Sequence, residues 1–288
     1  MAKPNVVVVC GGAPTPRTKK SDNIIRLNLT GQDANVELEI IDISRRLSYA
    51  VPDALTDLVE VATYVYCADQ AVKRGGEGVD DFGKNWRRRF SFHIPVRQQR
   101  IWSLPEVTQC LEATLSFLSE DEYSFQFTQK TDAVMLQQYL KYTDAGDSNS
   151  SEIDEVLLFS GGLDSLAGAV LETVQQQKRV AWVSHRSNPK ISSRQKRLVE
   201  GLRAICNLNP PLHVPIWAHQ RGSGGREYTQ RSRSFLYACM AFAVSRVFGL
   251  NRSRFYENGV VSLNLPISEQ VVGTRATRTT HPQTLGNF

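Results

Sequence analysis

The chain has 288 residues, of which 41% are hydrophobic and 22% charged, and this composition excludes both a peptide-sized scaffold and a disordered chain. Its 34 Lys and Arg residues against 29 Asp and Glu residues leave a net charge of +5, which favours an anionic ligand only weakly. No apolar run approaches the roughly 18 residues of a membrane span, and Met1–Asn5 leads into an apolar stretch without a signal-peptide layout. We expect a soluble, cytoplasmic protein of one or two domains.

The first half mixes strand and helix patterns. Residues 6–9 are an apolar run that ends in two glycines, and the prolines at 14 and 16 forbid a helix after it, so we expect a turn there. Apolar alternation at 25–29 and 36–40 around a turn at 31–35 predicts an antiparallel hairpin. Helical spacing predicts helices at 53–73 and 105–118, and period two predicts strands at 90–96 and 123–128. Residues 1–143 are therefore expected to form an α+β domain with antiparallel strands.

A linker and a second domain are predicted after it. Residues 144–151 contain no apolar residue larger than alanine, so we interpret 144–152 as a linker. Over 153–288, apolar runs at 155–159, 179–184 and 212–217 alternate with helical stretches near 164–177, 191–206 and 231–249. This alternation predicts right-handed crossovers and a parallel, Rossmann-like α/β sheet, which binds ligands at the carboxyl ends of its strands.

Five cysteines are spread along the chain at Cys10, Cys67, Cys110, Cys206 and Cys239. No pair has the C-x-x-C spacing of a zinc knuckle or redox motif, and the odd count argues against a disulfide framework. We expect buried, small apolar side chains with no part in function.

The most informative motif joins the strand at 155–159 to an apolar helix. Its residues are Ser160, Gly161, Gly162, Leu163, Asp164 and Ser165. The glycines leave room for a ligand against the main chain, and the helix amides and serine hydroxyls can bind an anion. A carboxylate at Asp164 suits a magnesium ion that accompanies phosphates. The motif lacks the lysine of a P-loop and the spacing of a dinucleotide fold, and the alternative interpretation is a plain capped turn.

This S-G-G-L-D-S motif resembles the pyrophosphate loop (PP-loop) of the N-type ATP pyrophosphatases. These enzymes transfer AMP to a carbonyl or carboxylate and release pyrophosphate. The resemblance implies ATP and Mg²⁺ as cofactors, with Asp164 as a magnesium ligand.

Arginines crowd the start of the helix predicted near 231. Arg226, Arg231 and Arg233 precede or open it, although cations there oppose the helix dipole. Phosphates bound nearby would offset that cost, so Arg231 and Arg233 are candidate catalytic residues beside Asp164 and Ser165. The alternative is a solvated basic turn.

A third constellation follows at Glu257, Asn258 and Gly259, with Arg275 and Arg278 further on. An amide and a carboxylate at a strand end can read the edge of a heterocycle, although such a segment is also typical of an ordinary turn.

Together the three segments resemble the QueC-like 7-cyano-7-deazaguanine synthases, most of all those found in anti-phage operons, over roughly residues 155–288. That family adenylates 7-carboxy-7-deazaguanine, after which ammonia displaces AMP, a reaction of queuosine biosynthesis. The resemblance implies that Ser184 and His185 border the adenosine, that Arg231 and Arg233 contact phosphates, and that Glu257, Asn258, Gly259, Arg275 and Arg278 bind the substrate. His185 equally fits a surface histidine.

Two departures from that family affect the expected function. The synthases end in zinc-binding cysteines, so Zn²⁺ is expected only in a C-terminal segment that this chain does not contain. The added residues 1–143 resemble the extension of the defence-associated members. We therefore expect an AMP-forming ligase whose amine acceptor is a co-encoded partner protein, with free nitrile synthesis as the alternative.

An alternative of another class is a tRNA- or DNA-binding module with an inactive nucleotide fold. It depends on a segment in which basic residues surround aromatic ones, a pattern that can bind nucleic acid. The basic residues are Lys84, Arg87, Arg88, Arg89, Arg97 and Arg100, and the aromatic ones are Trp86, Phe90 and Phe92. A strand with a charged outer face is the other interpretation of this segment.

Overall fold

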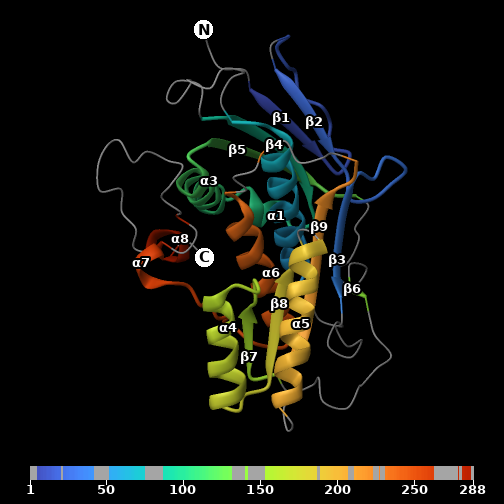
Figure 1. Ribbon diagram of the computed structural model, residues 1–288. Helices are drawn as coiled ribbons and strands as arrows, with labels where there is room; N and C mark the ends of the chain where they lie inside the picture. The colour runs from blue at the N-terminus through green and yellow to red at the C-terminus, as the bar shows by residue number, and fades with distance from the viewer. Residues whose placement is uncertain are drawn as a thin grey trace.

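The computed structural model describes residues 5–20, 22–41, 52–74, 87–131, 140–141, 153–186, 189–206, 211–222, 227, 231–262, 278 and 281–286. These residues form an α/β structure with two sheets, and helices lie between and outside them (Figure 1). No helix among them is both long and apolar enough to cross a membrane.

The first sheet is entirely parallel, with strand order β2-β1-β4-β5. Its strands are β1 (Val6–Cys10), β2 (Asn23–Leu27), β4 (Arg89–Val96) and β5 (Glu122–Gln129). Aromatic side chains of β4 and β5 stack across the register, and the rings of Phe92 and Phe125 lie 5.1 Å apart. Such cross-strand aromatic pairs stabilise the sheet and bury its inner face.

The second sheet is mixed, with strand order β6-β3-β9-β8-β7. Strands β7 (Glu155–Leu158), β8 (Val180–His185) and β9 (Leu212–Gln220) run parallel, as the strand-helix alternation predicts. β3 (Val36–Ile41) pairs antiparallel with β9, and β6 (Leu140–Lys141) pairs parallel with β3. A strand from the first half of the chain thus completes the sheet of the second half.

Two central helices fill the space between the sheets (Figure 1). They are α1 (Asp53–Ala71) and α6 (Arg233–Val247), which pack on each other, and one apolar core joins them to both sheets. On the far side of the second sheet, α4 (Leu163–Val170) and α5 (Pro189–Ile205) cover Leu157 and Trp182. A π-helical turn, η3 (Leu171–Gln175), continues α4.

The remaining helices flank α1 and α6. They are α2 (Gln99–Trp102), α3 (Pro105–Ser119), α7 (Gly259–Ser262) and α8 (Pro282–Gly286). The predicted helices at 53–73 and 105–118 are confirmed by α1 and α3, and the strands at 90–96 and 123–128 by β4 and β5.

The predicted hairpin is wrong, and so is the expectation of antiparallel strands within a first-half sheet. The chain does reverse between Asn28 and Asn35, where the Asn35 N–H donates to the Asn28 carbonyl over 2.9 Å. Beyond that closure the two strands separate: β2 pairs in parallel with β1, and β3 pairs with β9. Both strands alternate as hairpin strands do, and alternation carries no information about the partner strand. Most of the predicted linker lies outside the described residues.

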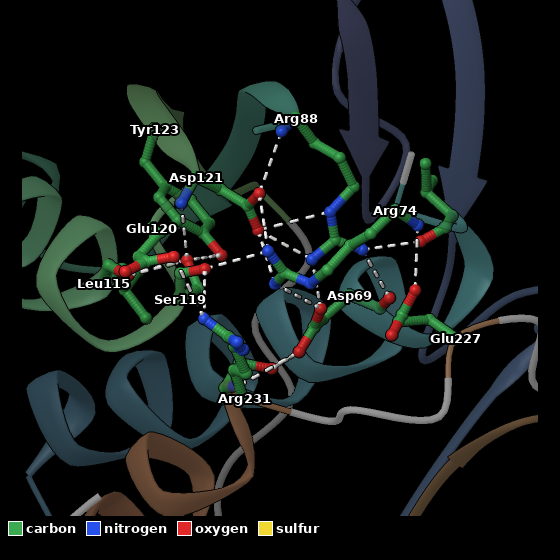
Figure 2. Close-up of polar contacts among 12 residues, drawn as sticks. Asp69, Arg74, Arg88, Leu115, Ser119, Glu120, Asp121, Tyr123, Glu227 and Arg231 are labelled. Atoms are coloured by element: carbon green, nitrogen blue, oxygen red, sulfur yellow. Dashed lines mark hydrogen bonds and ion pairs between the residues drawn. The ribbon is translucent and has the colours of Figure 1, made fainter. Parts of the chain in front are cut away.

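A buried cluster of charges ties α1 to the strand ends of the first sheet (Figure 2). The guanidinium of Arg74 forms a bidentate pair with Asp121, at 2.9 and 2.7 Å. Arg88 bonds the same carboxylate at 2.6 Å and also bonds Asp69. Burial alone would raise the pKa of Asp69, but Arg88 and Arg74 outweigh burial and hold that pKa below its usual value. We call Asp69, Arg74, Arg88 and Asp121 the ion cluster.

The basic segment considered for nucleic-acid binding is partly internal: Arg88 and Arg97 are buried, whereas Arg87, Arg89 and Arg100 are exposed. Arg88 belongs to the ion cluster, and Arg97 is buried against Asp57 and Glu60 at 2.8 Å each. Phe90 and Phe92 are also buried, so neither ring offers a stacking surface. The exposed arginines fit the interpretation of a strand with a charged outer face, nucleic-acid binding stays a prediction, and Lys84 and Trp86 lie outside the described residues.

Four of the five cysteines are buried, as predicted, but Cys110 is exposed on α3. The packing prediction is wrong for that residue because its position faces outward on the helix. The other four contribute small apolar volume to the interior.

Candidate functional site

The predicted loop lies where β7 ends and α4 begins. Gly161 has a φ of +80°, a left-handed conformation that favours glycine. A Cβ at this position would lie 3.1 Å from the Gln195 side chain, so the loop also needs glycine for space. Gln195 reaches across from α5, and its Nε2 donates to the Ser160 carbonyl over 3.1 Å. The backbone of the loop is thus held from outside the motif.

The two serines of the loop face each other. Their hydroxyl oxygens lie 3.1 Å apart, and the Ser165 hydroxyl donates to the Gly162 carbonyl over 3.0 Å. Leu163 and Asp164 point outward, and Leu163 is 81% exposed. The first amides of α4 have no acceptor within the helix, so the turn offers amides, hydroxyls and a free-standing carboxylate together.

Glu257 reaches the loop because its segment runs alongside β7. The Leu158 N–H donates to the Arg254 carbonyl over 3.0 Å, and the Arg254 N–H donates to the Val156 carbonyl over 2.8 Å. This parallel bridge carries the chain to the carboxyl end of the sheet. Glu257 then lines a cavity of about 40 Å³ together with Ser160 and Ser165. The sequence placed Glu257 in a different motif from the two serines, and the fold brings the three residues together.

Tyr256 fixes the approach of Glu257 to the loop. Its ring packs directly on Gly168 of α4, where an added Cβ would come within 2.2 Å of the ring. Its hydroxyl donates to Glu172. Sequence reasoning missed Tyr256, although a glycine inside a helix is a signal for close packing at that point.

Two carboxylates meet at the mouth of the loop. Partial burial and the charge of Asp164 raise the pKa of Glu257 above its usual value. A divalent cation would relieve this repulsion, and one or two carboxylates plus phosphate oxygens are the usual ligands of Mg²⁺. Asp164 and Glu257 therefore fit a magnesium ion that arrives with a nucleotide. Within the described part of the chain, no group of three or more His, Cys, Asp or Glu side chains can hold a metal.

Ser184 and His185 lie beneath the site and do not line the cavity. The Ser184 hydroxyl donates to the Phe159 carbonyl over 2.7 Å and lies 3.0 Å from His213 Nε2. His185 is 2% exposed, and its Nε2 lies 3.1 Å from the Ala218 carbonyl. Burial lowers the pKa of His185 to about 4, so the ring is neutral at pH 7. His185 is not a surface histidine, and its contact with adenosine stays a prediction.

The two arginines before and at the start of α6 lie in different surroundings. Arg233 Nη2 donates to the Tyr237 hydroxyl over 2.8 Å, and Tyr237 lines the loop cavity. Arg231 instead contacts Glu120 at 3.4 Å, and the carboxylate of Asp69 accepts the Ser232 N–H at the start of the helix. These carboxylates offset the unfavourable dipole, and Arg231 and Arg233 are only partly exposed, so a solvated basic turn does not describe them, while Arg226 lies outside the described residues.

The last predicted site residues do not join the loop. Arg278 donates to Glu120 over 2.8 Å and to the Phe117 carbonyl over 2.9 Å, both at the end of α3. Arg275 lies outside the described residues. Asn258 and Gly259 follow Glu257, and the Asn258 carbonyl accepts the Ser262 N–H over 2.9 Å, which begins α7. Of the candidate substrate-binding residues, Glu257 has the clearest place at the site.

No protein-family model, curated protein or solved structure matches the chain. The structure itself gives the class of the molecule, which is an α/β fold with a serine- and glycine-rich turn at the carboxyl end of a parallel strand.

Proposed function

We propose that the protein is an AMP-forming, pyrophosphate-releasing ligase built on a Rossmann-like PP-loop domain. The observation that carries this proposal is the meeting of Ser160, Ser165 and Glu257 at one cavity, with Asp164 beside them. Open strand ends of parallel sheets are where nucleotides bind, and a turn rich in donors next to carboxylates suits polyphosphate with its metal.

Different residues of the site would bind the phosphates of ATP and the metal ion. The amides of the turn and the hydroxyls of Ser160 and Ser165 bind the β- and γ-phosphates. Asp164 and Glu257 would hold Mg²⁺, which neutralises charge on the departing pyrophosphate. An oxygen of the substrate carboxylate attacks the α-phosphorus and the bond to pyrophosphate breaks, which gives an acyl adenylate. An amine then displaces AMP, loses a proton and forms the amide.

The identity of the reactants is proposed from the resemblance to the deazaguanine synthases. A 7-carboxy-7-deazaguanine-type acid is the proposed carboxylate, and the amide of Asn258, the residue after Glu257, would read its polar edge. For the acceptor we propose an amine of a partner protein from an anti-phage defence system, and residues 1–143 would dock it. Ammonia is the alternative acceptor. It gives a primary amide, and a second ATP would then adenylate the amide oxygen, so that loss of AMP and a proton gives the free nitrile of queuosine biosynthesis.

The test is ATP-dependent pyrophosphate release by the full chain, with the deazaguanine carboxylate and Mg²⁺. We expect Asp164→Asn to lower the rate by about 100-fold or more, because it removes a metal-binding charge where charge develops. Asp164 is exposed, so the unfolding midpoint should not change. Asp154→Asn is the matched control, because Asp154 is an exposed carboxylate at the opposite end of β7 that bonds Arg179.

Equal rates for wild type, Asp164→Asn and Asp154→Asn would refute the assignment of the loop. Mass spectrometry of the products then identifies the acceptor: added mass on a co-encoded protein supports conjugation, and free nitrile alone supports the synthase.

A further inference from the structure

Tyr237 is a cavity residue that none of the sequence motifs contains. It lies in the first half of α6, away from the loop in sequence, yet it lines the loop cavity with Ser160 and Ser165. A tyrosine in that place brings a hydroxyl to the point where the proposed pyrophosphate would bind. Its surroundings decide what this hydroxyl can do.

Arg233, one helical turn before Tyr237, engages the oxygen of this hydroxyl. Its Nη2 donates to Tyr237 Oη over 2.8 Å, and its guanidinium carbon lies 5.1 Å from the centroid of the tyrosine ring. Burial disfavours the cation, but the contacts with Tyr237 and Tyr66 outweigh burial and raise the pKa of Arg233. The guanidinium therefore stays charged at any pH at which the protein is folded.

The rings behind Tyr237 fix its orientation. His185 lies 5.6 Å from the Tyr237 ring in an edge-to-face contact, and Tyr66 lies 5.2 Å from His185 in another. Because His185 is uncharged at neutral pH, Arg233 is the cation that acts on the phenol from this side. Tyr237 thus lines the cavity while its hydroxyl is held by a partly buried cation.

A phenol oxygen that accepts a bond from a guanidinium can still donate its own proton, and the cation strengthens that donation. On this basis, and resting on the proposed function, we propose that Tyr237 is a catalytic residue that donates a hydrogen bond to the pyrophosphate group of ATP, with Arg233 as its positioning residue. Arg233 thereby acts on phosphate without contacting it. Arg231, bound to Glu120, has no such route among its described contacts.

The test compares two single-hydroxyl deletions. Tyr237→Phe keeps the ring but removes the donor, and we expect a loss of about 10- to 100-fold in the rate of pyrophosphate release and in affinity for inorganic pyrophosphate. Tyr123→Phe is the matched control. It removes one hydroxyl from a buried ring of the first sheet, where that hydroxyl accepts a bond from Ser119 over 3.1 Å and the ring does not line the loop cavity. We expect near wild-type values for that control.

Coupling between the two residues separates a functional role from a packing role. Arg233→Gln removes the charge, and its effect on pyrophosphate affinity should not add to that of Tyr237→Phe. Both variants disrupt the same hydrogen-bonded pair. Arg233→Lys keeps the charge and should retain more activity than Arg233→Gln. A purely structural role would change the unfolding midpoint and leave the pyrophosphate affinity of the folded protein unchanged.

The outcomes distinguish the two proposals. A wild-type chain that binds neither ATP nor inorganic pyrophosphate would overturn the proposed function, and this inference with it. A wild-type chain that binds both, while Tyr237→Phe behaves like Tyr123→Phe, would overturn the inference alone. Should Tyr237→Phe fail to fold, the arginine variants decide, because equal pyrophosphate affinity in wild type, Arg233→Lys and Arg233→Gln would contradict the role of the pair.

Discussion

The ion cluster and the loop site are both made of polar side chains, but they differ in how completely those side chains are paired. In the ion cluster, Asp121 accepts bonds from both arginines (Figure 2). Asp69 also accepts two from Ser232. At the loop, Asp164 stands exposed, and its charge raises the pKa of Glu257, a like charge that lines the cavity. Charges that satisfy one another hold a fold together, whereas neighbouring like charges that are not paired with cations make a region a candidate for ligand binding.

The largest expected effect on stability tests the ion cluster. Arg88→Met leaves Asp69 and Asp121 with one cation fewer in the interior, and we expect the free energy of unfolding to fall by about 3–5 kcal/mol. The measurement is urea unfolding of the full chain, with pyrophosphate release per folded molecule as the second readout, which should not change.

The neighbouring arginine provides the control. Arg89 pairs with Glu122 at 2.6 Å with both side chains about half exposed, so Arg89→Met should leave the free energy of unfolding close to the wild-type value. Equal decreases in the free energy of unfolding of Arg88→Met and Arg89→Met would show that burial does not determine how much an ion pair stabilises this protein. The contrast between the ion cluster and the loop would then not hold.

A second effect concerns the histidines beneath the loop. Burial lowers the pKa of His185 and of His213 from 6.5 to about 4. Between these values the unfolded chain binds protons that the folded chain does not, so the free energy of unfolding falls as the pH drops from 6.5 to 4 and is constant above that window. The loss reaches about 3 kcal/mol for each histidine.

Urea unfolding at a series of pH values measures this loss. His213→Gln keeps a donor for Ser184 and should make the curve less steep within the same window. An unchanged slope in that variant would mean that His213 is already protonated in the fold, and the region beneath the loop would then hold charge.

The smallest expected effect separates the two arginines that the sequence placed together. Arg231→Ala removes one partner of Glu120, which keeps its 2.8 Å bond from Arg278, so we expect a loss of about 1 kcal/mol. Pyrophosphate release should stay at the wild-type rate. A fall in that rate as large as the fall in Arg233→Gln would place Arg231 at the active site after all and contradict the separation.

Some of the site could be predicted because its information is local. The loop follows a buried strand and precedes a helix. Glycine, serine and aspartate at adjacent positions in such a turn indicate an anion-binding turn. Tyr237 was accessible in the same way, since it lies four positions after Arg233 on one helix, where side chains meet.

Other features depend on contacts between residues far apart in sequence, and no local pattern encodes them. Arg88 looks like a surface residue in a basic stretch, and it becomes internal only because Asp69 and Asp121 arrive from α1 and the start of β5. The partner of β3 was hidden for the same reason. An alternating strand shows which of its faces is buried but not which strand lies beside it.

The pairing of β3 has a consequence for how the chain is made. Val36 lies opposite Gln220 and Ile40 opposite Ile216, so β3 leaves the ribosome long before its antiparallel partner exists. Until β9 is synthesised, the nascent chain carries a strand with an unpaired edge, and closing so long a loop slows folding. Synthesis of the last third of the chain thus sets when the sheet beneath the loop can be completed.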